Sequence, residues 1–472
     1  MLIKTVILHT SPSLQLHLNG TIINDLIYLI INNNYYYNSS YLLITINTIL
    51  NSFNYNYYNH VKYQQLQIKQ SATAAPTPTA TAVLAATFKQ TSDDTNGHGK
   101  VQNQFEEAEA LSSLNIALEM KRIGKMDKAL KLFKHAVALA PQHPDILNYY
   151  GEFMEGINDI VLADQLYFKA LTYAPDHQKA LQNRQRTATI VEDIDGTTLI
   201  EIDKKRDMLS TIPDSNSALR RTKKEAYVLN IFHTVAIEGN TMTLAETRSV
   251  LETRMAISGH SIDEHNEIIG MDLAMKYLNS TLVNRIGRIT LEDILELHKR
   301  VMGAVDIVEG GRFRRTQVYV GNHIPPGPDQ LTILMNQFIE WLNSESALEL
   351  HPIRYAAIAH YKLVYIHPFV DGNGRTSRLL MNMILMQAGF PPVIIPKQHR
   401  HKYYETLELA NEGDIRPFIR FIAQCTEHTL DMYLWTTYEY KDQVPALDDT
   451  DHDHELINIV NNHNIKNNIL LN

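Results

Sequence analysis

The residues best suited to catalysis lie in one short stretch, residues 365–378, which reads YIHPFVDGNGRTSR. His367 can accept and release a proton near neutral pH. Asp371 is a natural ligand for a hard cation such as Mg²⁺, which prefers few carboxylates together with phosphate oxygens. Gly372 and Gly374 allow positive φ angles and a close approach of the backbone to a ligand. The stretch therefore predicts a proton-transfer site beside a glycine loop.

Two apolar segments flank this stretch and would position it. Residues 351–365 are apolar at helical spacing, which predicts a buried helix that delivers His367 at its end, and Pro368 helps to stop that helix. Residues 379–387 predict a second apolar helix, whose free N–H groups would open onto the glycine loop and form an anion site. Arg375 and Arg378 are three residues apart and so point from one helix face toward that site. This convergence of positive charge indicates phosphate binding.

Together these residues resemble the signature of the Fic family, H-x-F-x-D/E-G-N-G-R-x-x-R. Every specified position matches, at His367, Phe369, Asp371, Gly372, Asn373, Gly374, Arg375 and Arg378. Fic proteins mostly transfer AMP from ATP to a protein hydroxyl. The chain has no Walker-type G-x-x-x-x-G-K-S/T loop, which disfavours a P-loop kinase.

The resemblance implies a role for each of these residues. His367 would be the catalytic base that takes the proton from a target Ser, Thr or Tyr. Asp371 would hold Mg²⁺, or alternatively Mn²⁺, on the α- and β-phosphates of the ATP substrate, and Arg378 would receive the γ-phosphate. The ATP-binding residues implied in this way are Val320, Gly321, Asn322, His323, Asp371, Gly372, Asn373, Gly374, Arg375, Thr376, Ser377, Arg378, Tyr403, Tyr404 and Asn411.

Upstream of the signature, residues 311–321 read GRFRRTQVYVG, and their alternation predicts a short β-hairpin. Fic proteins carry a flap at this position, which can hold a target segment by strand addition. An ordinary surface hairpin is the alternative. Tyr403, Tyr404 and Asn411 resemble family positions that contact the base and ribose, although on their own they could equally be core tyrosines and a helix cap.

An inhibitory element is predicted before the Fic core. Residues 226–238 are apolar at helical spacing and end at Gly239-Asn240, a reasonable helix stop. Thr234 to Asn240 resemble the Fic inhibitory motif, S/T-x-x-x-E-G/N. In the family the glutamate, here Glu238, pairs with the second arginine, here Arg378, and keeps it from the γ-phosphate. The alternative is a surface carboxylate at a helix end.

An internal repeat occupies residues 105–181. Ala129 recurs as Ala163 and Phe133 as Tyr167, and Ala136 and Ala140-Pro141 also recur, each at a spacing of 34 residues. This period resembles the tetratricopeptide repeat and predicts two helical hairpins with a concave binding surface. Residues 182–220 then predict a connector helix, with a break at 211–216.

The ends of the chain differ from the rest. Residues 1–70 contain a long uncharged run rich in Asn, Tyr and Ile, which we interpret as a low-complexity N-terminus or a degenerate signal anchor. Residues 71–104 predict a linker because they begin with SATAAPTPTATA, and residues 435–472 predict a C-terminal tail. The net charge of −9 argues against a nucleic-acid partner, and the single cysteine excludes an intramolecular disulfide.

The predicted fold class is all-α, with tetratricopeptide hairpins, a connector helix and an α-helical Fic domain that carries a small β-hairpin flap. The Fic region would span residues 221–434, with the inhibitory helix at 226–240 and the Fic core at 289–424. The order of these parts resembles animal Fic proteins of the endoplasmic reticulum membrane, which are single-pass proteins with a lumenal catalytic domain. A cytoplasmic location is the alternative, and membrane attachment is left open.

Those relatives attach AMP to a chaperone, BiP, and remove it again, so the resemblance implies a BiP-like target, a de-AMPylase activity and room for a homodimer. Two alternatives stay open. The chain could use another nucleotide or a phosphocholine donor, or it could be a repeat-based adaptor with an inactive Fic domain.

Overall fold

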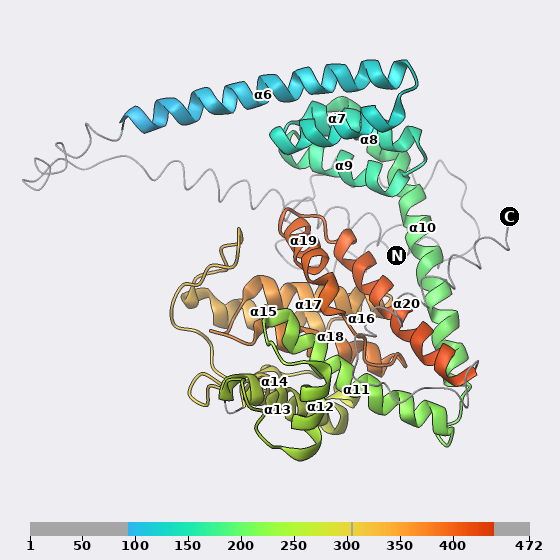
Figure 1. Cartoon of the computed structure of the whole chain (residues 1–472), viewed down its shortest axis with the longest axis vertical. Coiled ribbons are helices and arrows are strands. Elements are labelled where there is room, and N and C mark those ends of the chain that lie inside the picture. Colours follow the sequence, from blue (N-terminus) through green and yellow to red (C-terminus); the bar gives the residue numbers. More distant parts are fainter. Residues whose placement is uncertain (1–92, 304, 439–472) are drawn as a thin grey trace, which may run out of the picture. The chain divides into compact units, whose positions relative to one another are not determined.

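The computed structural model describes residues 93–303 and 305–438. Within these ranges the secondary structure consists of helices and turns without a β-strand, which confirms the predicted all-α class (Figure 1). The chain divides into two units, residues 1–99 and 100–472, and nearly all described residues belong to the second. The predicted N-terminal segment 1–70 and most of the predicted linker and tail lie outside the described residues.

Four helices form the repeat region. They are α6 (Asp93–Arg122), α7 (Met126–Leu139), α8 (Pro144–Gly156) and α9 (Ile160–Tyr173). Of the alanines that recur at 34 residues, those within the helices are fully buried, because only a small side chain lets two helices cross closely; they are Ala129, Ala136, Ala163 and Ala170. Phe133 and Tyr167 recur in the same way and fill the core between the helices. The helix α6 begins at Asp93, before the predicted boundary at residue 105.

A long helix and a tight turn lead from the repeats into the Fic region. The helix α10 spans Gln178–Ser210, and α11 spans Ser217–Glu238. The turn between them falls in the predicted break, where Pro213 cannot donate a backbone hydrogen bond and the Asn216 side chain caps α11 by accepting from Leu219 N–H. The helix α11 ends at Gly239, whose φ of 114° gives the left-handed cap that the sequence predicted.

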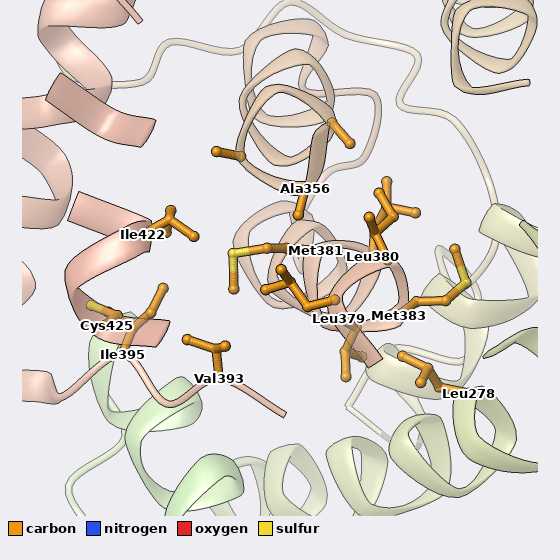
Figure 2. Close-up of a cluster of buried hydrophobic side chains, with 14 of the residues drawn as sticks. Leu278, Ala356, Leu379, Leu380, Met381, Met383, Val393, Ile395, Ile422 and Cys425 are labelled. Atoms are coloured by element: carbon orange, nitrogen blue, oxygen red, sulfur yellow. The ribbon is translucent and has the colours of Figure 1, made fainter. Parts of the chain in front are cut away.

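The Fic region packs its helices around α18. Its elements are α12 (Leu244–Thr253), α13 (Ile262–Tyr277), α14 (Leu291–Met302), α15 (Leu331–Leu342), α16 (Glu345–Leu348), α17 (Pro352–Ile366), α18 (Asn373–Gln387), α19 (Arg400–Asn411) and α20 (Arg416–Tyr438). Figure 2 shows Leu379, Leu380 and Met381 of α18 among side chains from the neighbouring elements. A helix that is apolar on all sides must be enclosed, so the start of α18 is fixed by the core.

The predicted β-hairpin at residues 311–321 does not form as a ladder. The segment makes a single antiparallel bridge, between Val320 and His323, around a turn at Gly321. The returning strand would contain Pro325 and Pro326, which lack N–H donors and cannot extend a ladder. The carbonyl of Pro325 accepts instead from the side chain of Gln317 at 2.8 Å. We keep the name flap for residues 314–326.

At the C-terminus, α20 continues to Tyr438, past the predicted start of the tail at residue 435. No helix in the described ranges is long and apolar enough to cross a membrane. The predicted signal anchor lies outside those ranges and is not tested by this finding.

The tight crossing of α8 and α9 gives a first prediction, the substitution Gly151→Ala. A Cβ on Gly151 would lie 2.4 Å from the Tyr167 ring. The ring cannot easily move, because the Tyr167 hydroxyl donates to Glu155 at 2.8 Å. We expect this substitution to lower the free energy of unfolding by about 1–3 kcal/mol, measured by chemical denaturation. Gly156→Ala is the matched control, since it lies in the same helix with no atom within 4 Å of its Cβ. Equal stabilities of the two variants would contradict the crossing described here.

Candidate active site

His367 sits directly after α17 in a conformation that exposes one ring nitrogen. Its φ of 49° and ψ of 58° place it in the left-handed region, which is uncommon for a residue with a Cβ. Its Nδ1 lies 3.1 Å from the Val364 carbonyl oxygen, which can only accept a hydrogen bond. Nδ1 therefore carries the proton, and Nε2 keeps its lone pair. Burial lowers the pKa of His367, so the imidazole is neutral at physiological pH and can act as a base.

The loop after His367 is held by Asn373, the first residue of α18. The side chain of Asn373 accepts from Phe369 N–H at 3.0 Å and donates to the Phe369 carbonyl at 2.9 Å. Gly372 has a φ of 75°, and a Cβ there would lie 2.8 Å from the sulfur of Met302. The sequence therefore needs both an amide and a glycine at these positions to close the loop onto the helix.

Arg375 and Asp371 form the outer part of the site. Arg375 is almost fully buried and donates to Asp371 at 2.7 Å and to Glu267 at 3.2 Å. Its Nε has no hydrogen-bond partner among the described residues. The side chain of Asp371 is 61% exposed, so one carboxylate oxygen is open to a ligand. The charge of this buried guanidinium adds to that of the helix N-terminus, and together they favour an anion beside the loop.

Arg378 forms the inner part and is paired with residues of α11, the helix predicted to be inhibitory. Its Nη2 lies 2.7 Å from Glu238 Oε1 and also donates to the Thr234 carbonyl, while its Nε donates to the Thr234 hydroxyl at 2.7 Å. Burial alone would lower the pKa of Arg378, but Glu238 and Tyr403 raise it above its ordinary value. The guanidinium is thus charged and satisfied within the protein.

Tyr403 links Arg378 to a second buried histidine. The Tyr403 hydroxyl accepts from Arg378 Nη1 at 3.2 Å and lies 3.0 Å from His360 Nε2. Burial lowers the pKa of His360 well below its usual range, so His360 is neutral and accepts from the hydroxyl. Tyr404, the next residue, is partly exposed. The Cζ atom of the Arg400 guanidinium lies over the Tyr404 ring, 5.1 Å from the ring centre.

The remaining predicted residues are spread more widely. Val320, Gly321, Asn322 and His323 form the flap turn, where Asn322 donates to Glu408 of α19 and His323 Nε2 lies 2.9 Å from the Tyr365 carbonyl oxygen. Thr376 and Ser377 are fully buried in α18. Asn411 is the exposed last residue of α19, and no hydrogen bond between described residues joins it to the other predicted site residues. The structure therefore gathers all but Asn411 around the start of α18, α11 and the flap.

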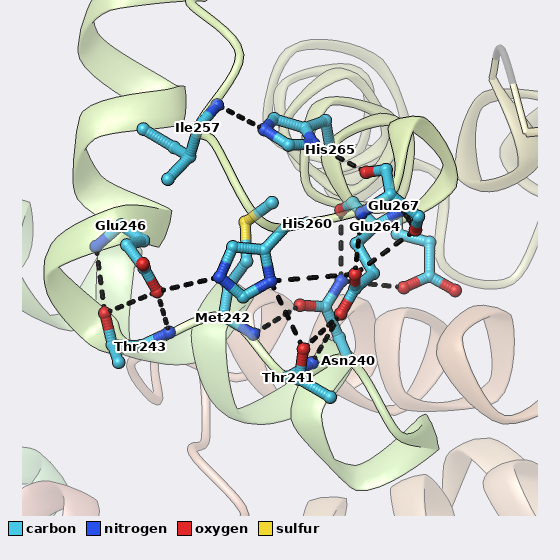
Figure 3. A network of polar contacts seen from close by, with 11 residues as sticks. Asn240, Thr241, Met242, Thr243, Glu246, Ile257, His260, Glu264, His265 and Glu267 are labelled. Carbon is cyan, nitrogen blue, oxygen red and sulfur yellow. Dashed lines mark hydrogen bonds and ion pairs between the residues drawn. The ribbon is translucent and has the colours of Figure 1, made fainter.

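The sequence prediction missed four polar residues that hold the site together, namely the half-buried Glu267 and the buried His298, Arg314 and His360. Figure 3 shows Glu267 beside Asn240, which donates to it at 2.8 Å just after the inhibitory helix. His298 lies 2.9 Å from the Asp371 carbonyl oxygen and accepts from Gly311 N–H at the same distance. Only His360 interrupts an apolar segment, whereas Glu267 and His298 stand beside other polar residues and Arg314 in an arginine-rich stretch, so the sequence alone gives a weak signal.

The fold and the loop define an all-helical protein with a neutral histidine beside a glycine loop at a helix N-terminus. A model of the Fic/DOC family matches residues 288–385. The protein of Aedes aegypti named "Protein adenylyltransferase Fic" is 63% identical over 359 residues, which cover 75% of this chain and 72% of the relative. The Drosophila virilis protein of the same name is 62% identical over 366 residues, with coverages of 77% and 75%. The chain therefore belongs to the Fic/DOC family.

A solved structure agrees with this assignment. The structure of Fic-1 from C. elegans superposes with a TM-score of 0.64 at 45% sequence identity, and the match covers 70% of this chain and 98% of that one.

The reciprocal pairing of Asn373 gives a second prediction. Asn373→Ala would leave the buried N–H and C=O of Phe369 without partners, and each unsatisfied group costs about 1–3 kcal/mol. We expect a loss of about 2 kcal/mol or more in the free energy of unfolding, measured by chemical denaturation. Asn373→Asp keeps the acceptor for Phe369 N–H but loses the donor to the Phe369 carbonyl. Its stability should therefore lie between that of the parent and that of Asn373→Ala. A stability of Asn373→Ala equal to that of the parent would show that the pairing does not hold the loop.

Proposed function

We propose that this chain is a protein adenylyltransferase that transfers AMP from ATP to a Ser, Thr or Tyr hydroxyl of a protein. The observation that carries the proposal is the free Nε2 of His367 beside the start of α18, where the buried guanidinium of Arg375 and the exposed carboxylate of Asp371 lie. The names of the insect relatives agree with it.

The reaction follows from this geometry. His367 Nε2 takes the proton of the target hydroxyl, and the hydroxyl oxygen attacks the α-phosphorus of ATP. A new phosphorus–oxygen bond forms, the bond to the β-phosphate oxygen breaks, and pyrophosphate leaves. General-base catalysis of this kind contributes about 10²–10⁴-fold. Most of the remaining rate enhancement comes from holding the reacting groups and neutralising their charge.

The N-terminus of α18 would bind the triphosphate. Asn373, Gly374 and Arg375 would contact the α- and β-phosphates, and Arg378 the γ-phosphate. The flap turn, Tyr403, Tyr404 and Asn411 would contact the nucleoside.

Asp371 would hold Mg²⁺, or Mn²⁺, because its exposed carboxylate is a hard oxygen donor beside the phosphate site. The described residues contain no cluster of three or more acidic, histidine or cysteine ligands. That absence is compatible with an ion held by one carboxylate, phosphate oxygens and water. The ion would supply charge neutralisation on the phosphates.

Glu238 would inhibit this reaction in the present conformation. Its carboxylate occupies the Arg378 guanidinium that the γ-phosphate requires. The same carboxylate lies against the phosphate loop, since a Cβ on Gly374 would fall 2.3 Å from Glu238 Oε1. A bound triphosphate would therefore lack the Arg378 guanidinium as a partner, and the Glu238 carboxylate would repel it.

We also propose that Glu238 supports the removal of AMP. A water molecule oriented by Glu238 would attack the phosphorus of the phosphodiester and the bond from phosphorus to the target oxygen would break. That oxygen would take a proton, which gives AMP and the restored target hydroxyl. A BiP-like chaperone as target, attachment to the endoplasmic reticulum membrane and a homodimer stay predictions from the family resemblance. The alternative donors, another nucleotide or a phosphocholine compound, can be tested by using them in place of ATP in the transfer experiments below.

The third prediction concerns Glu238→Gly. Because the substitution frees Arg378 and removes the repulsion, we expect AMP incorporation from α-labelled ATP to rise at least tenfold. The release of AMP from a modified protein should fall, since the same group orients the water. Glu238→Gln keeps the size of the side chain but removes its charge. Its AMP incorporation should lie between that of the parent and that of Glu238→Gly. Unchanged incorporation would mean that Glu238 is only a carboxylate at a helix end.

The fourth prediction concerns His367→Ala. We expect transfer to fall by about 10²–10⁴-fold while ATP binding, measured by calorimetry in the Glu238→Gly background, stays within about twofold. His367 contacts no predicted phosphate ligand through its side chain among the described residues, so binding should be spared.

The pH dependence provides an independent check of the same residue. The base must be neutral, and its pKa is lowered from its ordinary value near 6.5. Transfer should therefore hold at pH 6.5 and decline only as the pH falls through the lowered pKa. A decline that begins above pH 6.5 would argue for a different base.

A further inference from the structure

Arg314 is a buried arginine without an acidic partner. Only 2% of its surface is exposed, and no salt bridge between described residues includes it. A charged group in such a place is costly unless each of its donors is satisfied. Its partners therefore indicate why the site keeps an arginine.

Each of the three guanidinium nitrogens of Arg314 donates to a backbone carbonyl. Nε donates to the His367 carbonyl at 2.7 Å, Nη1 donates to the Thr316 carbonyl at 2.8 Å, and Nη2 donates to the Pro326 carbonyl. The backbone N–H of Arg314 donates to the Pro368 carbonyl at 2.9 Å. One residue thus joins both ends of the flap to two consecutive carbonyls of the catalytic loop.

This arrangement meets a need of His367 itself. Its left-handed backbone conformation is unfavourable for a residue with a Cβ, and the surroundings must maintain it. Arg314 holds the carbonyl of that same residue, so it restrains the strained backbone from which the imidazole projects. The flap lacks a strand ladder, and Arg314 supplies part of the order that a ladder would give.

We propose that Arg314 is a positioning residue that sets the orientation of His367 for proton transfer and couples it to the base of the flap. The proposal rests on the assignment of His367 as the base. Arg314 touches neither the base nitrogen nor the phosphate-binding residues in the described structure, so it acts through the backbone.

Charge provides a second link between the two residues. The groups that act on the His367 imidazole, besides burial and the Val364 carbonyl, are Arg314 and His323 of the flap and Glu238 of α11. The positive charge of Arg314 contributes to the lowered pKa of His367. Loss of that charge should therefore raise the pKa of His367, an effect that a purely structural role would not require.

The test uses the full chain in the Glu238→Gly background, where transfer should be measurable. Arg314→Met removes charge and hydrogen bonds. Arg314→Lys keeps the charge but cannot span three carbonyls. Arg312→Met, an exposed arginine in the same segment, is the matched control. The measurements are kcat, KM for ATP, and the titration of the His367 ring proton by NMR, assigned by comparison with His367→Gln.

We expect kcat to fall by about 10- to 100-fold in both Arg314 variants, as for a small misplacement of a reacting group, with KM for ATP within about twofold. The His367 titration should move to higher pH in Arg314→Met and stay near the parent value in Arg314→Lys. Arg312→Met should match the parent in all three measurements. If Arg314→Met does not fold, Arg314→Lys alone decides through kcat and KM.

Three results would overturn the proposal. They are a kcat within twofold of the parent in Arg314→Lys, equal losses of kcat and ATP binding in both variants, or an unchanged His367 titration in a folded Arg314→Met. If the parent itself transfers no AMP, the proposed function fails, and the NMR titration still decides whether Arg314 acts on His367.

Discussion

The burial of the Arg378 charge is the constraint on which the site depends. A guanidinium that deep in the protein must have partners at all times, because an unpaired buried charge would cost several kcal/mol. In this structure α11 provides Thr234 and Glu238, and α19 provides the Tyr403 hydroxyl. A nucleotide that enters the site must replace at least the carboxylate. In the proposed function, inhibition and substrate binding would therefore be alternative ways to meet one electrostatic requirement.

The helix packing makes that requirement strict. The helix α18 is surrounded by apolar side chains, so Arg378 cannot follow its partner to the surface. The loop before α18 is equally fixed, because Asn373 binds both polar groups of Phe369, and the His298 ring stacks on the Phe369 ring with centres 3.6 Å apart. His298 and Arg314 hold the two ends of the loop through backbone carbonyls. The site is thus rigid where charge develops and more open at the exposed Asp371.

The sequence could predict what is encoded locally. The helix before His367, the glycine loop, the two arginines and the helix stop at Gly239 depend on neighbouring residues, and the structure has them in the predicted places. The second helix starts earlier than predicted, at Asn373, because the buried loop tolerates glycine within its first turn. Contacts between distant segments could not be predicted, so Glu267, His298, Arg314 and His360 were missed. The alternation at residues 317–320 predicts a hairpin, but the two prolines that follow have no N–H groups with which to pair a second strand.

The contacts between Thr234 and Arg378 bear on how the inhibition proposed for Glu238 could be relieved. Two of the contacts of Arg378 go to the hydroxyl and carbonyl of Thr234, and these do not involve Glu238. Glu238 is the last residue of α11 and its side chain is 28% exposed, so it can rotate toward solvent while α11 stays in place. Rotamer changes of exposed side chains take picoseconds to nanoseconds, whereas helix displacements take microseconds or longer. In the proposed function, relief of inhibition would therefore require Glu238 to leave Arg378 while α11 stays in place, and the cost of separating the carboxylate from the buried guanidinium would set how often this occurs.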